Sequence, residues 1–230
     1  MNILITGGSG GLGRAIIELA AAEHTVYFTH NKRDCAWAEN RSNIKAIKTD
    51  FTVLSDVERL IAAMNEMDLD VLINNAYIGK PLGTHFHKTA AAEFMDSFAH
   101  NIMPTITITQ KAIAIFMAKR FGKIINVLSA YVAGPPTGFS RYACDKAYLA
   151  ELTLVWAKEY VRYNITANAI APEYMDTGFS NIDERFLEQA AERHPLKRIL
   201  TPQETAEAVM FFVAATQQIS GITIPVGHPQ

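Results

Sequence analysis

The sequence has little cysteine and no long apolar run. Its two cysteines, Cys35 and Cys144, lie far apart and form no CxxC pair, and so few thiols are typical of a reducing compartment. The most apolar stretch, 102–117, is interrupted by proline, lysine and glutamine, so no segment reaches the ~18 apolar residues of a membrane-spanning helix. The first residues lack a basic segment and reach glycine at Gly7. We therefore expect no signal peptide, no membrane partner and a cytoplasmic location.

Charge of neither sign is in excess. The 21 lysines and arginines against 23 aspartates and glutamates leave a net charge of -2, whereas nucleic-acid binders normally carry a basic surplus. A basic membrane-surface protein is disfavoured for the same reason. The pair His85 and His87 has no third ligand at a suitable spacing, so we expect no metal site.

The chain also lacks internal repeats, low-complexity tracts and proline- or serine-rich linkers. Its 230 residues are 49% apolar and 19% charged, which is a globular composition. This length fits one large domain better than two full-sized ones. We therefore expect a single domain over residues 1–230.

Short apolar strands instead alternate with longer helical stretches. Strands are predicted at Asn2–Thr6, Thr25–Thr29, Ile44–Lys48, Val71–Asn74, Lys123–Leu128, Ile165–Ile170 and Ile222–Val226. Helices are predicted at Leu12–Ala22, Leu54–Glu66, Ala91–Lys119, Tyr142–Tyr163 and Pro202–Thr216. The strands are apolar nearly throughout, as expected when both faces are covered. This order predicts an α/β fold, a doubly wound parallel sheet of about seven strands with helices on both faces, whose ligands bind beyond the carboxyl ends of the strands.

A glycine-rich loop joins the first strand to the first helix, with Thr6 followed by GGSGGLG at residues 7–13. Glycines let backbone N–H groups approach a pyrophosphate closely, and the helix N-terminus adds partial positive charge. The loop fits both TGxxxGxG and TGxxGxxG, so by itself it predicts a nucleotide site without deciding its kind. The residues expected at the cofactor are Thr6, Gly7, Ser9, Gly11, Leu12 and Gly13.

The segment after the second strand, residues 29–33, bears on the choice of cofactor. An acidic residue here favours NAD by accepting from the ribose 2′-hydroxyl, whereas basic groups favour the 2′-phosphate of NADP. Lys32 and Arg33 are basic, and no acid occurs before Asp34. The segment favours NADP(H), while NAD(H) stays open if these charges form only a solvated turn.

Tyr142 and Lys146 are four residues apart in a predicted helix and so share one face. An ammonium beside a phenol stabilises the phenolate and lowers a pKa that starts near ~10. Tyr142 is therefore a candidate proton donor or acceptor. Ser129 ends the predicted strand at 123–128, which places its hydroxyl at a carboxyl end of the sheet; it lacks the flanking glycines of a hydrolase nucleophile elbow.

These motifs together resemble the classical short-chain dehydrogenase/reductase family, and the resemblance runs nearly from end to end. The matching segments are TGGSGGLG at 6–13, Asp50 with Phe51, Asn74-Asn75-Ala76, Asn101, Ser129, Tyr142 with Lys146, and Asn168 to Pro172. Their order and the thirteen-residue gap between Ser129 and Tyr142 are those of the family. The NNA motif and the short chain favour this group over the extended epimerases, which resolves the ambiguity of the loop.

The resemblance implies a Rossmann fold and a carbonyl reductase that needs no metal. Tyr142 would protonate the carbonyl oxygen while a nicotinamide hydride adds to the carbon, Ser129 would hold that oxygen, and Lys146 would bind the nicotinamide ribose and lower the pKa of Tyr142. Asn101 would anchor a water relay. Two positioned hydroxyls thus meet the negative charge that develops on oxygen. Further residues implied at the cofactor are Asn31, Lys32, Arg33, Asp50, Phe51, Asn75, Ala76, Pro172 and Glu173.

Four positions depart from the family pattern. Tyr77 stands at the glycine of the NNAG motif, and Glu173 stands at the glycine of a Pro-Gly pair. Gly10 stands where many NADP-preferring relatives carry a basic residue. Pro225 cannot donate to a strand ladder, so the last strand is predicted at a sheet edge.

The leading hypothesis is an NAD(P)H-dependent reductase of ketones, with 3-oxoacyl thioesters, free or on a carrier protein, as the substrate class implied by the resemblance. A substrate loop is expected at about 173–200, with Phe179, Phe186 and Leu187 as its apolar wall, and the resemblance implies a homo-oligomer, dimer or tetramer. One alternative is an NAD-dependent alcohol or sugar dehydrogenase. Another is a cofactor-binding regulatory or scaffold protein without turnover, against which the presence of both Tyr142 and Lys146 speaks.

Overall fold

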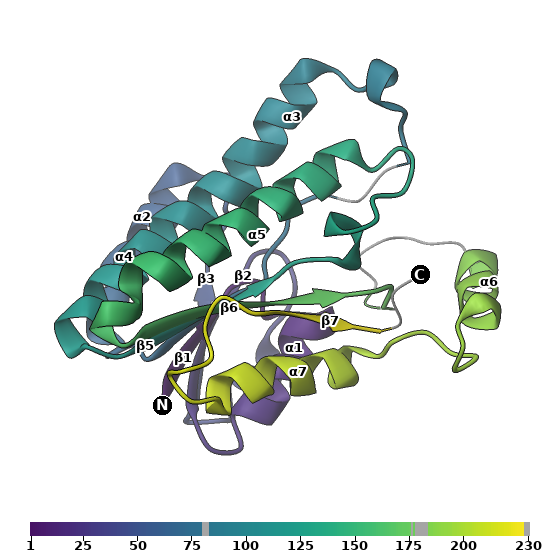
Figure 1. Ribbon diagram of the computed structural model, residues 1–230. Coiled ribbons are helices and arrows are strands. Elements are labelled where there is room, and N and C mark those ends of the chain that lie inside the picture. The colour runs from purple at the N-terminus through teal and green to yellow at the C-terminus, as the bar shows by residue number, and fades with distance from the viewer. Residues whose placement is uncertain (80–82, 176, 178–183, 228–230) are drawn as a thin grey trace.

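The protein is a seven-stranded parallel sheet between two layers of helices (Figure 1). The computed structural model describes residues 1–79, 83–175, 177 and 184–227, without the side chains of 184–187 and 193. The strand order is β3-β2-β1-β4-β5-β6-β7, and every neighbouring pair is parallel. The predicted doubly wound α/β fold is therefore confirmed.

The strands lie close to their predicted positions. They are β1 Asn2–Ile5, β2 Thr25–His30, β3 Ile44–Lys48, β4 Val71–Asn74, β5 Gly122–Val127, β6 Ile165–Pro172 and β7 Thr223–Val226. In β1 the side chains of Ile3 and Ile5 pack into one apolar cluster and that of Leu4 into another, on the opposite face. Because both faces are buried, the strand shows no alternation of polar and apolar residues.

The helices fill two layers. They are α1 Gly11–Ala20, α2 Leu54–Ala63, α3 Ala91–Ser97, α4 Met103–Lys119, α5 Ser140–Tyr160, α6 Glu184–Arg193 and α7 Pro202–Ala214. In Figure 1, α2, α4 and α5 cover one face of the sheet, while α1 and α7 cover the other. Thr201 caps α7 in a reciprocal box with Glu204, and a proline occupies the first turn, as the sequence predicts.

Two helical segments differ from the prediction. The stretch 91–119, predicted as one helix, is divided by a π-helical turn at Phe98–Ile102, and Pro104 lies in the first turn of α4. The predicted substrate loop contains α6, whose glutamates, alanines and leucine are strong helix formers. Phe179 lies outside the described residues, as do the side chains of Phe186 and Leu187.

Strand β7 lies at the edge of the sheet, as Pro225 predicts, and pairs only with β6 among the described strands. No helix in the described ranges is long and apolar enough to cross a membrane. The single-domain boundary, the substrate-loop boundary at about 173–200 and the homo-oligomer stay predictions.

Candidate active site

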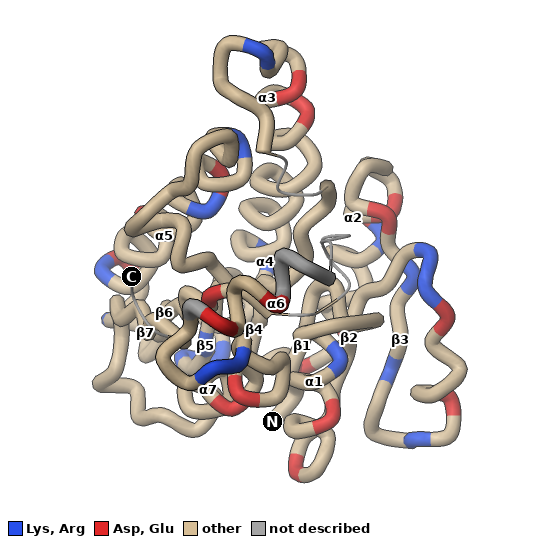
Figure 2. The backbone as a smooth tube through the Cα atoms, turned by 90° about the vertical axis from the view of Figure 1, so that its right-hand side faces the viewer, with Lys and Arg blue, Asp and Glu red and all other residues tan. Residues whose placement is uncertain are grey.

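A cavity of about 510 Å³ lies at the carboxyl ends of the strands. Figure 2 looks onto this edge of the molecule, with α6 in front of the central strands. The strand order reverses at β1, which has β2 on one side and β4 on the other, and such a switch point is where doubly wound sheets bind ligands. The loops after β1, β2, β4, β5 and β6 all contribute to the lining.

Most of the predicted cofactor and catalytic residues meet at this cavity. Those in its lining are Gly7, Ser9, Gly11, Leu12, Gly13, Asn31, Lys32, Arg33, Phe51, Asn75, Ala76, Ser129, Tyr142, Lys146, Pro172 and Glu173. Thr6, Asp50 and Asn101 do not line it, but each contacts a lining or adjacent residue. Residues separated by more than a hundred positions in the chain thus line the same cavity.

The glycine loop is packed tightly against its surroundings. A Cβ at Gly13 would collide with the carbonyl oxygen of Gly7 and lie 2.8 Å from Cα of Gly8. Gly7 has a φ of 69°, a left-handed conformation that disfavours side chains, and its Cβ would lie 2.8 Å from Cα of Ala76. The missing side chains leave the backbone of the loop facing the cavity.

Helix α1 begins at this loop without a capping side chain. Its N-cap residue is Gly10, which accepts no N–H through a side chain, and the first turn contains no acidic residue. The first backbone N–H groups of a helix need an outside acceptor, and they carry partial positive charge. An uncapped N-terminus that opens into a cavity therefore fits the pyrophosphate of a dinucleotide.

The turn after β4 is fixed to the glycine loop by Thr6 and Asn75. The Thr6 hydroxyl accepts from the backbone N–H groups of Asn75 and Ala76, at 3.0 and 3.1 Å. The Asn75 amide nitrogen donates in return to the carbonyls of Thr6 and Gly7, at 3.0 and 2.9 Å. Thr6 thus joins two walls of the cavity without reaching its surface.

Basic residues lie on the other side of the loop. The guanidinium of Arg33 fills the space into which a side chain at position 10 would project, and Lys32 and Asn31 line the same part of the cavity. Hydrogen bonds from Thr52 lower the pKa of the nearby Asp50, with smaller contributions from Asn31 and Lys32. This end of the cavity holds two cationic side chains from residues 31–33.

The predicted catalytic side chains converge at the opposite end. Ser129 follows β5, and its hydroxyl lowers the pKa of Tyr142 through a hydrogen bond. Tyr142 and Lys146 lie one turn apart on α5, and the Lys146 ammonium donates to the carbonyl of Val127 at 2.8 Å. The ammonium lies 5.8 Å from the centre of the Tyr142 ring.

Burial dominates the electrostatics of this group. It raises the pKa of Tyr142 in spite of the hydrogen bond from Ser129, so the expected lowering by Lys146 does not prevail. Burial also lowers the pKa of Lys146 to about 8, against an opposing effect of the Asp145 charge. At neutral pH Tyr142 is therefore a protonated phenol, as a proton donor must be.

Asn101 lies in the π-helical turn, a distortion that is frequent at functional sites. Its side-chain oxygen accepts from the N–H of Ile78 at 2.6 Å, and its amide nitrogen donates to the carbonyls of Ile78 and Ser97, at 3.1 and 3.0 Å. The structure therefore uses its side chain to hold the turn after β4. Its role in a water relay stays a prediction.

Aromatic side chains that the sequence did not single out as a group surround Tyr142. The rings of Tyr77 and Tyr131 lie 4.9 and 6.3 Å from its ring, both nearly perpendicular to it, and Tyr174 lies 6.2 Å from Tyr131. Burial raises the pKa of Tyr131 and of Tyr174. Neutral aromatic rings therefore form much of the surface beside Tyr142.

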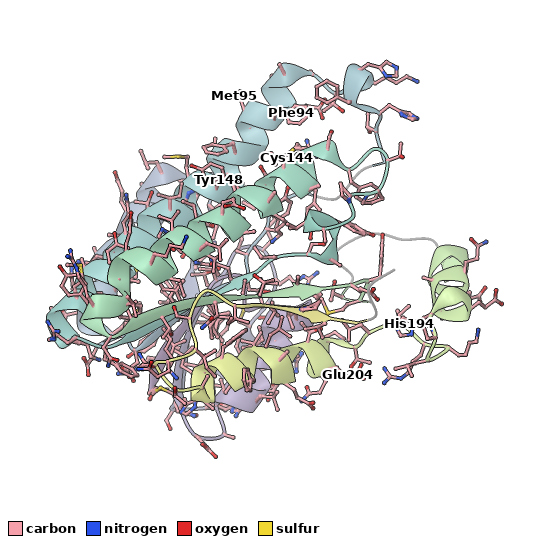
Figure 3. All side chains as sticks on the ribbon, in the orientation of Figure 1. Phe94, Met95, Cys144, Tyr148, His194 and Glu204 are labelled. Atoms are coloured by element: carbon pink, nitrogen blue, oxygen red, sulfur yellow. The ribbon has the colours of Figure 1, made fainter. Side chains whose placement is uncertain are left out.

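Glu173 connects three segments beside the cavity. Its carboxylate lies 3.8 Å from His194, which follows α6 and is seen in Figure 3 near the start of α7. A Cβ at Gly227 would lie 2.7 Å from the same carboxylate, and Gly227 has a φ of 118°. Gly227, which follows β7, thus leaves room for the carboxylate of Glu173, the residue that stands where the family has the glycine of a Pro-Gly pair.

Comparisons with known proteins agree with this geometry. A family model described as short chain dehydrogenase matches residues 1–185. The chain is 30% identical to the 3-oxoacyl-(acyl-carrier-protein) reductase MabA of Mycobacterium tuberculosis, over 98% of this chain and 90% of that protein. It is 31% identical to the reductase FabG of Aquifex aeolicus, over 98% and 94%. A solved 3-ketoacyl-(acyl-carrier-protein) reductase of Brucella melitensis, complexed with NADH, is 25% identical with a TM-score of 0.84, over 98% and 96%.

Proposed function

The chain belongs to the short-chain dehydrogenase family, and on this premise we propose that it reduces the ketone of a 3-oxoacyl thioester with NADPH. It is an oxidoreductase that binds a nicotinamide dinucleotide. The observation that carries the proposal is the meeting of Ser129, Tyr142 and Lys146 in the same cavity as the glycine loop and the cationic segment 31–33. A dinucleotide that bound along this cavity would be held by the glycine loop and residues 31–33, and it would supply a hydride near the three side chains.

The reaction requires a proton donor and a site for developing negative charge. When bound, the reduced nicotinamide supplies the hydride. The Tyr142 phenol donates its proton to the carbonyl oxygen of the substrate, and the Ser129 hydroxyl donates a hydrogen bond to the same oxygen. Lys146 stabilises the phenolate that results, because its ammonium lies on the same helix face and is held in place by Val127.

The preference for NADPH rests on the cationic end of the cavity. Lys32 and Arg33 both line it, and Arg33 lies over Gly10, the position at which many NADP-preferring relatives carry a basic residue. A guanidinium suits a phosphate because it offers several donors in one plane. Arg33 therefore supplies, from the segment after β2, the charge that the glycine loop lacks.

The substrate class rests on the family and on the relatives. The two curated relatives named above are 3-oxoacyl-(acyl-carrier-protein) reductases, and the chain covers nearly all of each. The neutral aromatic rings of Tyr77, Tyr131 and Tyr174 suit the uncharged 3-oxo segment of such a substrate. Acetoacetyl thioesters are the simplest members of this class.

The test follows loss of NADPH absorbance with acetoacetyl-coenzyme A, diketones, quinones and sugars. We expect the highest kcat/KM with the thioester and a loss of about 100-fold or more in Tyr142→Phe, because that variant keeps the ring and removes the proton donor. Tyr163→Phe, in the 3-10 turn that follows α5, is the matched control. NADPH binding without reduction of any carbonyl would contradict the proposal and favour a scaffold role, and oxidation of sugars or alcohols with NAD would favour the dehydrogenase alternative.

A further inference from the structure

A buried carboxylate lies directly behind the proposed catalytic group. Asp145 precedes Lys146 on α5 and is 6% exposed. One of its oxygens accepts hydrogen bonds from the hydroxyls of Tyr77 at 2.8 Å and Ser97 at 2.6 Å. Buried carboxylates are rare unless they are paired, and this one is bonded to two neutral groups. Its charge is not cancelled by those partners.

Tyr77 connects this carboxylate to the catalytic side chains. Its hydroxyl is held by Asp145, while its ring lies 5.1 Å from the Lys146 ammonium and 4.9 Å from the ring of Tyr142. A cation is attracted to the face of an aromatic ring, more strongly where water is excluded, and Lys146 is 3% exposed. A glycine at position 77, as in the family motif, would offer neither the ring nor the hydroxyl.

We propose that Asp145 and Tyr77 are positioning residues for the reduction, and that together they hold the buried Lys146 ammonium in its charged form. This inference rests on the proposed function. Ser97 completes the arrangement by holding the same carboxylate oxygen and by bonding to Asn101 at 3.4 Å. Tyr77 and Asp145 are 68 positions apart in the chain, so only the fold joins them to Lys146.

Other titratable groups also surround the catalytic pair. They are Tyr131 after β5, Tyr174 and Glu173 after β6, and the ion pair of Glu93 with Arg141 between α3 and α5. The two tyrosines stay neutral, because burial raises the pKa of each. The Glu173 carboxylate lies 3.8 Å from Nε2 of His194, and the Glu93 carboxylate lies 3.4 Å from the guanidinium of Arg141. Each of these carboxylates has a basic partner of its own, whereas Asp145 acts on Lys146.

The direction in which the pH profile shifts without the Asp145 charge follows from the protonation states that the reduction requires. Reduction requires a protonated Tyr142 and a charged Lys146, so loss of a proton from either group stops it. The negative charge of Asp145 stabilises the ammonium and therefore opposes loss of a proton from Lys146. Without that charge, the alkaline fall in activity must begin at a lower pH.

The test compares pH profiles of kcat/KM for thioester reduction in the parent, Asp145→Asn, Tyr77→Leu and Glu151→Gln. We expect the alkaline fall of Asp145→Asn to move about one pH unit lower, with near-parental activity at about pH 6. The alkaline fall of Tyr77→Leu should move in the same direction by a smaller amount. Glu151→Gln loses the same charge from an exposed site on α5 and matches the parent. A loss of equal size at every pH would indicate a merely structural role and overturn the inference.

A second measurement does not depend on turnover. The ¹³Cε signal of Lys146 is assigned by its absence in Lys146→Met. It is then followed against pH in the parent, in Asp145→Asn and in Tyr77→Leu. The inference expects a lower titration midpoint in Asp145→Asn and in Tyr77→Leu, and an unchanged midpoint overturns it. If the parent reduces no carbonyl, the proposed function fails while this midpoint still decides the role of Asp145. If Asp145→Asn does not fold, Tyr77→Leu decides through the same two measurements.

Discussion

The guanidinium of Arg33 lies directly over Gly10, in the space that a side chain at position 10 would need. The two residues come from the end of the loop after β1 and from the segment after β2, 23 positions apart in the chain. Position 10 and position 33 therefore compete for one place at the cofactor cavity. A cation at either position would serve the same end of the dinucleotide.

This relationship predicts that Arg33→Ala weakens NADPH binding selectively. A hydrogen bond to a charged group contributes about 1.5–3 kcal/mol, so the Kd for NADPH should rise by about tenfold to about a hundredfold. The Kd for NADH should change little, because NADH lacks the 2′-phosphate. Titration of nicotinamide fluorescence measures both constants. Arg59→Ala, which removes an exposed guanidinium from α2, is the control, and an equal loss for both cofactors would contradict the assignment.

Gly10→Ala provides a second test of the same contact. Its Cβ collides with the end of a flexible side chain, so Arg33 can move aside and the fold is kept. We expect a several-fold rise in the KM for NADPH with unchanged kcat. A fall in thermal stability with unchanged KM would show that Arg33 has no part in cofactor binding.

Gly13→Ala should abolish binding of both cofactors. Its Cβ collides with the carbonyl oxygen of Gly7, which is backbone and cannot move without shifting the loop. The uncapped first turn of α1 then no longer meets the pyrophosphate. The matched control is Gly134→Ala, since a Cβ there meets nothing within 4 Å. Calorimetric titration with NADPH and with NADH distinguishes the two variants, and retained binding in Gly13→Ala would refute the role of this loop.

The parent enzyme should lose activity on the alkaline side. Because burial lowers the pKa of Lys146 to about 8 and raises that of Tyr142, Lys146 loses its charge first as the pH rises. We expect kcat/KM for reduction to stay level at lower pH and to fall as the pH passes about 8. A profile that stays level up to about pH 10 would show that the charge on Lys146 is not required.

Lys123 should be important for stability and not for catalysis. This residue of β5 is 5% exposed, and its ammonium donates to the carbonyls of Val213 and Ala215 at the end of α7, both at 2.6 Å. Lys123→Met keeps the apolar length of the side chain and leaves these carbonyls unpaired, which should cost about 1–3 kcal/mol of unfolding free energy. Urea denaturation measures the loss. Lys158→Met, on the exposed face of α5, should unfold like the parent.

The sequence by itself determined the elements and the parts of the site that depend on local order. Strands buried on both faces are largely apolar, so β1, β4, β5 and β6 were visible as apolar runs, whereas β3 lies at the other edge of the sheet and is mostly exposed. The helical repeat alone places Tyr142 and Lys146 on one face, and the glycines before α1 predict a backbone that approaches a ligand. Pro225 likewise predicted an edge strand, because proline has no N–H for a ladder.

The tertiary structure decided what depends on contacts between distant segments and on burial. The periodicity of 91–119 gave no sign of the π-helical turn at Asn101, whose side chain is bonded to the turn after β4. The pKa of Tyr142 was expected to fall because of Lys146 and instead rises, since desolvation depends on how completely the surrounding chain covers a group. The bond between Tyr77 and Asp145 exists because the turn after β4 lies beside α5. Sequence spacing fixes neighbours along one element, whereas the strand order and the packing of the helices fix which elements meet.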